Sequence, residues 1–340
     1  MRAAPHWTTG VFLALALVFS LTTAMAQAPG VPIETQQPLT NDEQILGKAA
    51  VLREAGELLG AEEVAAQLVS PKGGAVALAE PSQKRMSGRE LAQRAREAYL
   101  RLGWYYRCKR CEKWHLQVTG AYAIAPDAIA TCHHCVVPGA DMREGYLIAV
   151  DHRGNVLPVT GVIAQNAAID CAILRVKGGE LTVLAVQDNV APGDPAFCFS
   201  EPLGQHGYFT MGIVNRFFWK PARIGKPGSL EELSGLRVNV STDWAPGSSG
   251  AAVLDECGNA IGHVSQVAPM GPRSRAEAPA PKAKKDALAV GDEKAVAPPK
   301  ETRAPERAVL IILHEAIPAR GVRALALSAA SESPAEVVKP

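Results

Sequence analysis

The chain has 340 residues, of which 47% are hydrophobic, and its formal net charge is +1. This length supplies enough apolar side chains for one large domain or two modest ones with a buried core. A charge so close to zero provides no global attraction to nucleic acid or to an anionic membrane surface, and we therefore expect no nucleic-acid partner.

Residues 1–26 have the pattern of a secretory signal peptide. Arg2 precedes the apolar run TGVFLALALVFSLTTAMA, and Ala24-Met25-Ala26 fits a small-x-small cleavage site. The alternative is an uncleaved anchor, but the run is short for a membrane-spanning helix. We expect cleavage near Ala26, no stable membrane anchor, and a secreted or periplasmic location, where disulfide bonds are permitted.

Residues 27–85 are interpreted as an N-terminal helical region followed by a linker. Thr40 and Glu43 have capping-box spacing at the start of a helical stretch that continues to QLV. Proline and glycine then break the pattern in SPKGGAVALAEPSQK. Ser87 and Glu90 repeat the capping-box spacing and predict a second helix over SGRELAQRAREAY.

Residues 86–266 contain the main predicted domain. From Leu100 onward, short β-branched or alternating runs such as CAILRV and LRVNVSTD are separated by turn signals. DHRGN and DECGN are typical of hairpin turns that contain glycine. This rhythm of short strands predicts an all-β sandwich or barrel.

The last part of the chain changes composition twice. Residues 267–307 are rich in Ala, Pro, Lys and Glu and lack aromatic residues, which predicts a disordered insertion because little apolar surface can be buried. A basic binding tail is the alternative, although acidic residues offset the basic ones. AVLIILHEAIP and ARGVRALAL then predict a last strand and a helix within 308–328, and 329–340 form a predicted disordered tail.

Three short motifs carry side chains suited to nucleophilic catalysis. APGSSGAAV places Ser249 in a turn where Gly247 allows backbone N–H groups to converge on one point. DCAILRV places Asp170 at the start of an apolar strand, and AIATCHHCVV places His134 just after another. Each signal is weak alone, but the order His, Asp, Ser in an all-β chain is that of the chymotrypsin arrangement.

In these motifs the chain resembles the trypsin-like serine proteases, particularly the bacterial secreted branch with an HtrA-like core. TCHHCVV is similar to the family's TxxHxV, and Thr131 matches its Thr, so His134 rather than His133 falls on the catalytic position. DCAILRV and PGSSGAAV are similar to its aspartate and nucleophile motifs. The resemblance implies a mainly β fold of two antiparallel Greek-key β-barrels, with N-terminal helices and a short C-terminal helix. It covers the protease core and no PDZ domain.

The resemblance also implies a role for each site residue. Ser249 would be the nucleophile, His134 the general base and acid, and Asp170 the residue that orients the imidazole. The N–H groups of Gly247 and Ser249 would form the oxyanion hole. The chain would then be a serine endopeptidase that hydrolyses protein or peptide substrates through an acyl-enzyme and needs no cofactor for catalysis.

Asp243 is a candidate substrate-binding residue. It lies six residues before Ser249, the offset of the carboxylate that selects Lys or Arg in trypsin. A buried carboxylate there would bind a cationic side chain next to the cut. The alternative is that Asp243 caps the end of a strand.

Four of the seven cysteines form two CxxC pairs with 20 residues between them: Cys108, Cys111, Cys132 and Cys135. The spacing is close to that of a structural zinc site, while a secreted setting favours disulfides. In either case we expect the four sulfurs to cluster and to brace the turn that carries His134. The surroundings fit neither a thioredoxin-like redox motif nor haem attachment.

Two further hypotheses remain beside the enzyme. One is a non-catalytic protein-binding module on the same fold, and the other is a structural zinc-binding protein. All three triad residue types are present, which favours the enzyme.

Overall fold

The computed structural model describes residues 41–220, 229–270 and 311–331. The predicted signal peptide, most of the predicted insertion and residues 332–340 of the predicted tail lie outside these ranges. The predicted start of the tail at residue 329 is wrong, because residues 329–331 form the end of the last helix, Ala319–Ser331. None of the helices within these ranges has the length and apolar character needed to cross a membrane.

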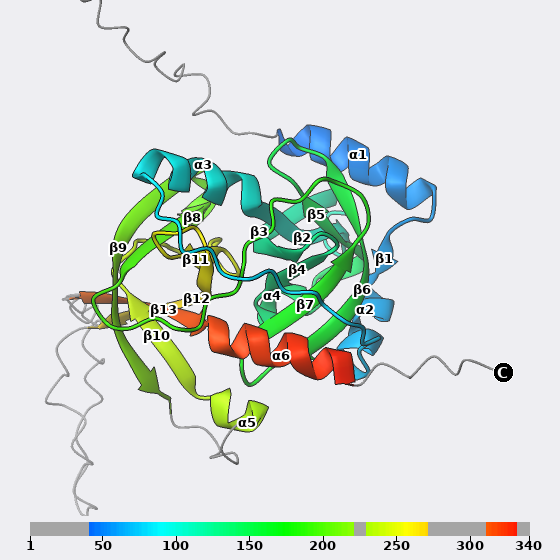
Figure 1. Ribbon diagram of the computed structural model, residues 1–340. Helices are drawn as coiled ribbons and strands as arrows, with labels where there is room; N and C mark the ends of the chain where they lie inside the picture. The colour runs from blue at the N-terminus through cyan, green and yellow to red at the C-terminus, as the bar shows by residue number, and fades with distance from the viewer. Residues whose placement is uncertain (1–40, 221–228, 271–310, 332–340) are drawn as a thin grey trace, which may run out of the picture. The chain divides into compact units, whose positions relative to one another are not determined.

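The first half of the described chain forms a closed antiparallel β-barrel (Figure 1). Six strands follow one another in the order β5-β2-β3-β4-β7-β6, and pairing of β5 with β6 closes the ring. The short β1 (Leu59–Gly60) adds to the outside of β5. The six strands are β2 (Tyr99–Cys108), β3 (Trp114–Ala125), β4 (Ala128–Thr131), β5 (Met142–Val150), β6 (Val156–Asn166) and β7 (Cys171–Val176).

The second barrel is also closed and antiparallel, with the strand order β10-β13-β12-β11-β8-β9. Its strands are β8 (Pro195–Ser200), β9 (Tyr208–Trp219), β10 (Leu236–Val240), β11 (Ala252–Leu254), β12 (Ala260–Met270) and β13 (Ile311–Pro318). The structure thus confirms a mainly β fold of two six-stranded antiparallel barrels with a few helices. Burial of the β-branched and aromatic residues of these strands accounts for the rhythm seen in the sequence.

The predicted start of the disordered insertion at residue 267 is wrong. Val267 pairs with His314 and Met270 pairs with Ile311, so residues 267–270 are the end of β12. Backbone hydrogen bonds to β13 hold this segment in the sheet. The amino-acid composition of a segment cannot reveal a strand partner that lies far away in the sequence. Residues 271–310 lie outside the described ranges.

Helices lie on the barrels and at their junction (Figure 1). They are α1 (Asp42–Glu54), α2 (Ala61–Val69), α3 (Gly88–Ala98), α4 (His133–Val136), α5 (Leu230–Leu233) and α6 (Ala319–Ser331), with a 3₁₀ turn at Pro202–Gly204. The structure confirms the capping box at α3, where Ser87 Oγ accepts from the Glu90 N–H and Glu90 Oε2 accepts from the Ser87 N–H. At α1 the cap is Asn41 rather than Thr40, because Asn41 Oδ1 accepts the Glu43 N–H at 2.9 Å.

The N-terminal helical stretch is divided in two by a left-handed glycine. Gly56 has φ +70°, which ends α1 and lets the chain enter β1 before α2 begins. Ile45 and Ala49 of α1 are buried in a small cluster with Tyr105 and Ile148 of the first barrel. The helices therefore add a layer to the outside of that barrel.

One hydrophobic cluster joins the two barrels. It contains Tyr122 and Ile124 from β3 together with Phe199 from β8 and Val253 from β11. The Tyr99 and Phe199 rings meet edge to face with their centroids 5.4 Å apart. This shared core fixes one barrel against the other, and the loops at the junction carry the candidate site.

Candidate active site

His134 lies in α4, a single turn that follows β4. The turn is anchored to both barrels, because Thr131 Oγ1 donates to the Gly120 carbonyl of β3 at 2.8 Å and Cys132 Sγ donates to the Val264 carbonyl of β12 at 3.0 Å. Cys132 and Cys135 on either side are buried, whereas half of the His134 side chain is exposed. The backbone therefore holds the imidazole at the surface from a rigid base.

The structure brings His134 and Asp170 together. His134 Nδ1 lies 3.0 Å from both carboxylate oxygens of Asp170, and the His134 backbone N–H donates to Oδ1 at 3.1 Å. Asp170 has φ +64°, an uncommon conformation for a residue with a side chain. This conformation turns the carboxylate at the start of β7 towards the imidazole.

The contact between Asp170 and His134 lowers the pKa of the carboxyl group and raises that of the imidazole, so both changes favour the charged pair. Burial alone acts to raise the pKa of Asp170, but hydrogen bonds from His134 and Ser265 outweigh it and lower that pKa to about 2. The hydrogen bond to Asp170 raises the pKa of His134 above its usual value. Asp170 thus stabilises the charged imidazolium, and a hydrogen bond with the Cys135 side chain raises the pKa of His134 further.

Ser249 lies in the turn between β10 and β11 and is pressed against the first barrel. Its carbonyl accepts the Gly120 N–H at 2.7 Å, and the next residue, Gly250, donates to the Val264 carbonyl at 2.8 Å. Gly250 has φ +83°, and a Cβ on it would lie 2.1 Å from the Gly120 oxygen and 2.3 Å from Thr131 Oγ1. Only glycine fits here, and this close approach places Ser249 beside the end of β4, three residues before His134.

Two backbone donors of the Ser249 turn are open. The Ser248 N–H donates to Ala245 and the Gly250 N–H to Val264, but within the described ranges the N–H groups of Gly247 and Ser249 have no acceptor. Gly247 has φ +102°, as a sharp turn requires. Among the described contacts, no hydrogen bond joins the His134 ring to the Ser249 hydroxyl. The arrangement thus has an oriented imidazole, a nearby hydroxyl and free N–H donors.

Asp243 does not have the burial expected of a carboxylate at the bottom of a pocket. The residue is exposed, and its backbone carbonyl accepts from Thr210 Oγ1 at 3.2 Å. The neighbouring Trp244 is buried instead and packs edge to face on His314, with centroids 5.0 Å apart. The loop therefore turns the tryptophan inwards and leaves the carboxylate at the surface.

Two residues of β12 complete the surroundings of Asp170, although no sequence motif identified them. Ser265 Oγ donates to Asp170 Oδ2 at 2.6 Å, and His263 Nε2 lies 3.2 Å from the Asp170 carbonyl oxygen. His263 is fully buried, and its desolvation lowers its pKa to about 4. The register of β12 with β13 shifts between Val264 and Gln266, so the alternation of a regular strand could not have shown from the sequence that both residues contact Asp170.

The expected cluster of four sulfurs does not form. Cys108 and Cys111 lie with His115 at the tip of the β2–β3 hairpin, whereas Cys132 and Cys135 lie with His134. Thr119, which hydrogen-bonds to Cys135, is six residues along β3 from Lys113 at the tip, or about 20 Å in an extended strand. All seven cysteines are free thiols in this structure. The long hairpin is the reason for the separation, because it carries the first pair away from the site.

The two closed barrels with a histidine–aspartate pair at their junction define a chymotrypsin-like fold, and comparison with known proteins agrees. A family model described as a trypsin-like peptidase domain matches residues 118–262. The matched range includes both β4 with His134 and the Ser249 turn.

The curated relatives are serine proteases. The putative serine protease HhoB of Synechocystis is 28% identical over 105 residues, which are 30% of this chain and 24% of that protein. The serine protease PepD of Mycobacterium tuberculosis is 28% identical over 123 residues, which are 35% of this chain and 26% of that protein. This chain thus aligns with about a quarter of the length of either relative.

A solved structure of an HtrA-type protease, AlgW with a decapeptide, is also similar. The two chains share 16% sequence identity and superpose with a TM-score of 0.49. The match covers 73% of this chain and 69% of the AlgW chain.

Proposed function

We propose that the protein is a serine endopeptidase with Ser249, His134 and Asp170 as its catalytic triad. The observation that carries the proposal is the His134 imidazole held at 3.0 Å by Asp170 beside the Ser249 turn. A histidine buttressed through Nδ1 presents Nε2 as the base for a nearby hydroxyl. The trypsin-like domain and the serine protease relatives support the same reaction class.

In this mechanism Ser249 Oγ attacks the scissile carbonyl carbon while His134 Nε2 takes the hydroxyl proton. The negative charge that develops on the carbonyl oxygen accepts hydrogen bonds from the N–H groups of Gly247 and Ser249. Collapse of the intermediate breaks the C–N bond, and His134 returns the proton to the leaving amine. Water then hydrolyses the acyl-enzyme by the reverse proton route. Asp170 stabilises the imidazolium in both steps, and catalysis needs no cofactor.

The proposed substrate is an extended segment of a protein or peptide. In β12, residues 260–263 pair with β11, but from Gln266 to Met270 the described ladder partners come from β13 alone. One edge of this segment is therefore free of strand partners, and it starts next to Ser265 and Asp170. A peptide added there as a further strand would pass the Ser249 turn.

The cellular location is a second part of the proposal. The pattern of residues 1–26 supports export and cleavage near Ala26. The mass and N-terminal sequence of the protein recovered from an exporting host test this directly. A chain that retains Met1 would contradict export by cleavage.

A fluorophosphonate probe tests the nucleophile. It should label the wild-type chain once, on Ser249, and Ser249→Ala should abolish labelling without changing the circular dichroism spectrum. Ser248→Ala is the matched control and should keep the label, because Ser248 is buried and points away from solvent. A folded wild-type protein that takes no label would favour the non-catalytic binding module instead.

A further inference from the structure

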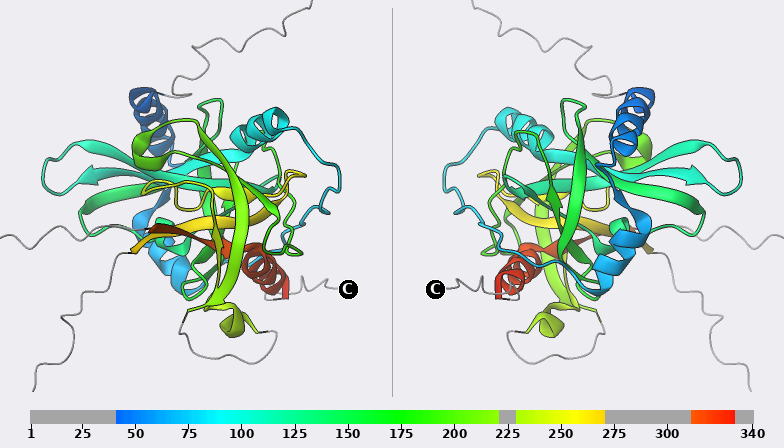
Figure 2. Two further views of the ribbon diagram at one scale, coloured as in Figure 1. Left: turned by 90° about the vertical axis from the view of Figure 1, so that its left-hand side faces the viewer. Right: turned by 90° about the vertical axis from the view of Figure 1, so that its right-hand side faces the viewer.

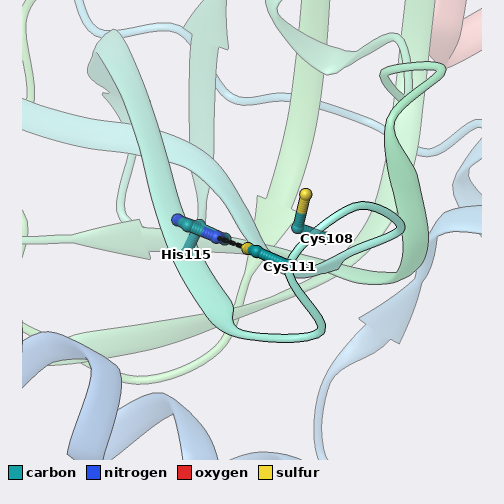
Figure 3. A group of neighbouring side chains, drawn as sticks. All are labelled: Cys108, Cys111 and His115. Atoms are coloured by element: carbon teal, nitrogen blue, oxygen red, sulfur yellow. Dashed lines mark hydrogen bonds between the residues drawn. The ribbon is translucent and has the colours of Figure 1, made fainter.

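We propose that the tip of the β2–β3 hairpin is a zinc site formed by Cys108, Cys111 and His115. One ligand atom from each residue, two Sγ atoms and an imidazole nitrogen, lies within 4.8 Å of the others (Figure 3). Cys111 Sγ and His115 Nε2 are 2.9 Å apart. The site does not involve the triad and goes beyond the proposed protease function.

The separation of the donors fits one tetrahedral ion. Zinc bound to sulfur at about 2.3 Å and to nitrogen at about 2.0 Å places a sulfur and a nitrogen about 3.6 Å apart, and two sulfurs about 3.8 Å apart. From 2.9 Å, the His115 nitrogen has to move by less than 1 Å relative to Cys111 Sγ. The fourth position is left for a water molecule. Two thiolates and an imidazole are soft and borderline donors, a set that favours zinc over calcium or magnesium.

The backbone of the tip is already arranged around a thiolate. The Arg110 N–H points at Cys108 Sγ at 3.3 Å, and such a donor stabilises negative charge on sulfur. The Glu112 N–H donates to the Cys108 carbonyl at 3.1 Å, and Glu112 has φ +57°, which closes the turn tightly enough to bring the two cysteines together. The turn thus presents both sulfurs on one side.

His115 is held in place by the opposite strand. It pairs directly with Tyr106 in the β2–β3 ladder, and the two rings stack with centroids 5.5 Å apart. The tyrosine therefore limits rotation of the imidazole beside Cys111. A disulfide between Cys108 and Cys111 would give no reason for an imidazole nitrogen within bonding distance of a sulfur, whereas a metal site accounts for all three positions.

The location explains what the ion would do. Strands β2, β3 and β5 extend beyond the body of the first barrel (Figure 2). Cys108 is half-buried and Cys111 is exposed, so little apolar burial stabilises this end of the hairpin. A bound ion that joins the end of β2 to the start of β3 would stabilise the projecting tip, because binding energy available only to the folded site adds to its stability.

Cobalt substitution of the full chain, purified with Ser249→Ala and kept reduced, tests the site. We expect one Co²⁺ per chain with the intense visible bands of a tetrahedral ion and a thiolate-to-metal charge-transfer band, both displaced by one equivalent of Zn²⁺. Cys108→Ser combined with Cys111→Ser should abolish the charge-transfer band, and His115→Ala should weaken zinc binding at least tenfold.

Two matched variants separate this site from the other thiols. Cys257→Ser should retain the full cobalt spectrum. Cys132→Ser combined with Cys135→Ser should also retain it, because those sulfurs lie with His134. The proposal is overturned if the reduced chain binds no metal, if binding survives loss of Cys108 and Cys111, or if it disappears with Cys132 and Cys135. Probe labelling of Ser249 in the wild-type chain is independent of each result.

Discussion

The buried imidazole of His263 predicts a specific loss of stability in weak acid. Burial lowers its pKa from 6.5 to about 4, so the unfolded chain binds one more proton than the folded chain between these values. Stability must therefore fall as the pH falls from 6.5 towards 4. The shift of about 2.5 pKa units corresponds to about 3 kcal/mol in total, of which about 2 kcal/mol is lost by pH 5.

Other groups near the site also titrate in or close to that pH range, and the pKa of Cys135, lowered to about 5, adds a loss of stability of the same sign. The stabilising ionisation of Asp170, with a pKa of about 2, is present above the usual carboxyl value near 3.8 and is lost only below it. The raised pKa of His134 contributes stability that is complete below pH 6.5 and is lost progressively as the pH rises from 6.5 through the folded-state pKa. The contribution of His263 is therefore isolated by the difference between parent chain and His263 variant over pH 7.5 to 5, in which the contributions of the other groups cancel.

The assay is urea unfolding followed by tryptophan fluorescence, with Ser249→Ala as the parent chain to prevent self-cleavage. His263→Gln keeps an amide donor for the Asp170 carbonyl but has no proton to gain. The parent should lose about 2 kcal/mol more than this variant between pH 7.5 and 5. His152→Gln, in a partly exposed turn, should lose stability like the parent. Equal slopes for the parent and His263→Gln would refute the neutral buried imidazole.

Three further predictions concern the triad and the junction of the barrels. Asp170→Asn should lower kcat/KM on the order of 10⁴-fold and move the acid limb of its pH profile to lower pH, because the pKa of His134 loses its largest raising contribution; an unchanged midpoint would contradict the pairing. Ser265→Ala should reduce kcat/KM about tenfold and shift that limb in the same direction, since one donor to Asp170 is lost; a change in KM alone would argue against its action through Asp170. Gly250→Ala should abolish probe labelling and lower thermal stability. Gly56 also has a positive φ, +70°, but a Cβ built there would meet nothing within 4 Å. Gly56→Ala should therefore lower the free energy of unfolding only by the left-handed strain of about 1–2 kcal/mol, and the variant should keep the label. Equal effects of the two glycine variants would show that the contact at Gly250 does not matter.

Local patterns in the sequence were sufficient for the fold class. Strands β4 and β7 are almost entirely apolar because the structure buries all of their residues except Arg175. Turns with glycine separate the strands of the chain. The three motifs of the proposed triad were recognisable because each places a particular residue in a turn or at a strand end. The closure of α3 by its capping box was equally local.

Contacts between distant segments could not be read from the sequence. Ser265 and His263 lie in β12 around a shift in its register with β13, and only the packing of β12 against the start of β7 gives them a partner in Asp170. The 20-residue spacing of the two CxxC pairs suggested that their sulfurs would cluster. The long β2–β3 hairpin instead carries the first pair away from the second. His115 becomes a candidate ligand only when the strand pairing returns it to Cys111.

The candidate site depends on the junction of the barrels more than on either barrel alone. His134 belongs to the first barrel, yet its turn is fixed by Cys132 donating to Val264 of the second. Ser249 belongs to the second, yet its carbonyl is held by Gly120 of the first. Asp170 starts β7 of the first barrel and receives Ser265 from the second. Since every triad residue is hydrogen-bonded across the junction, directly or through its own turn, a small shift between the barrels would misplace all three together. Hydrolysis should therefore be lost before either barrel unfolds.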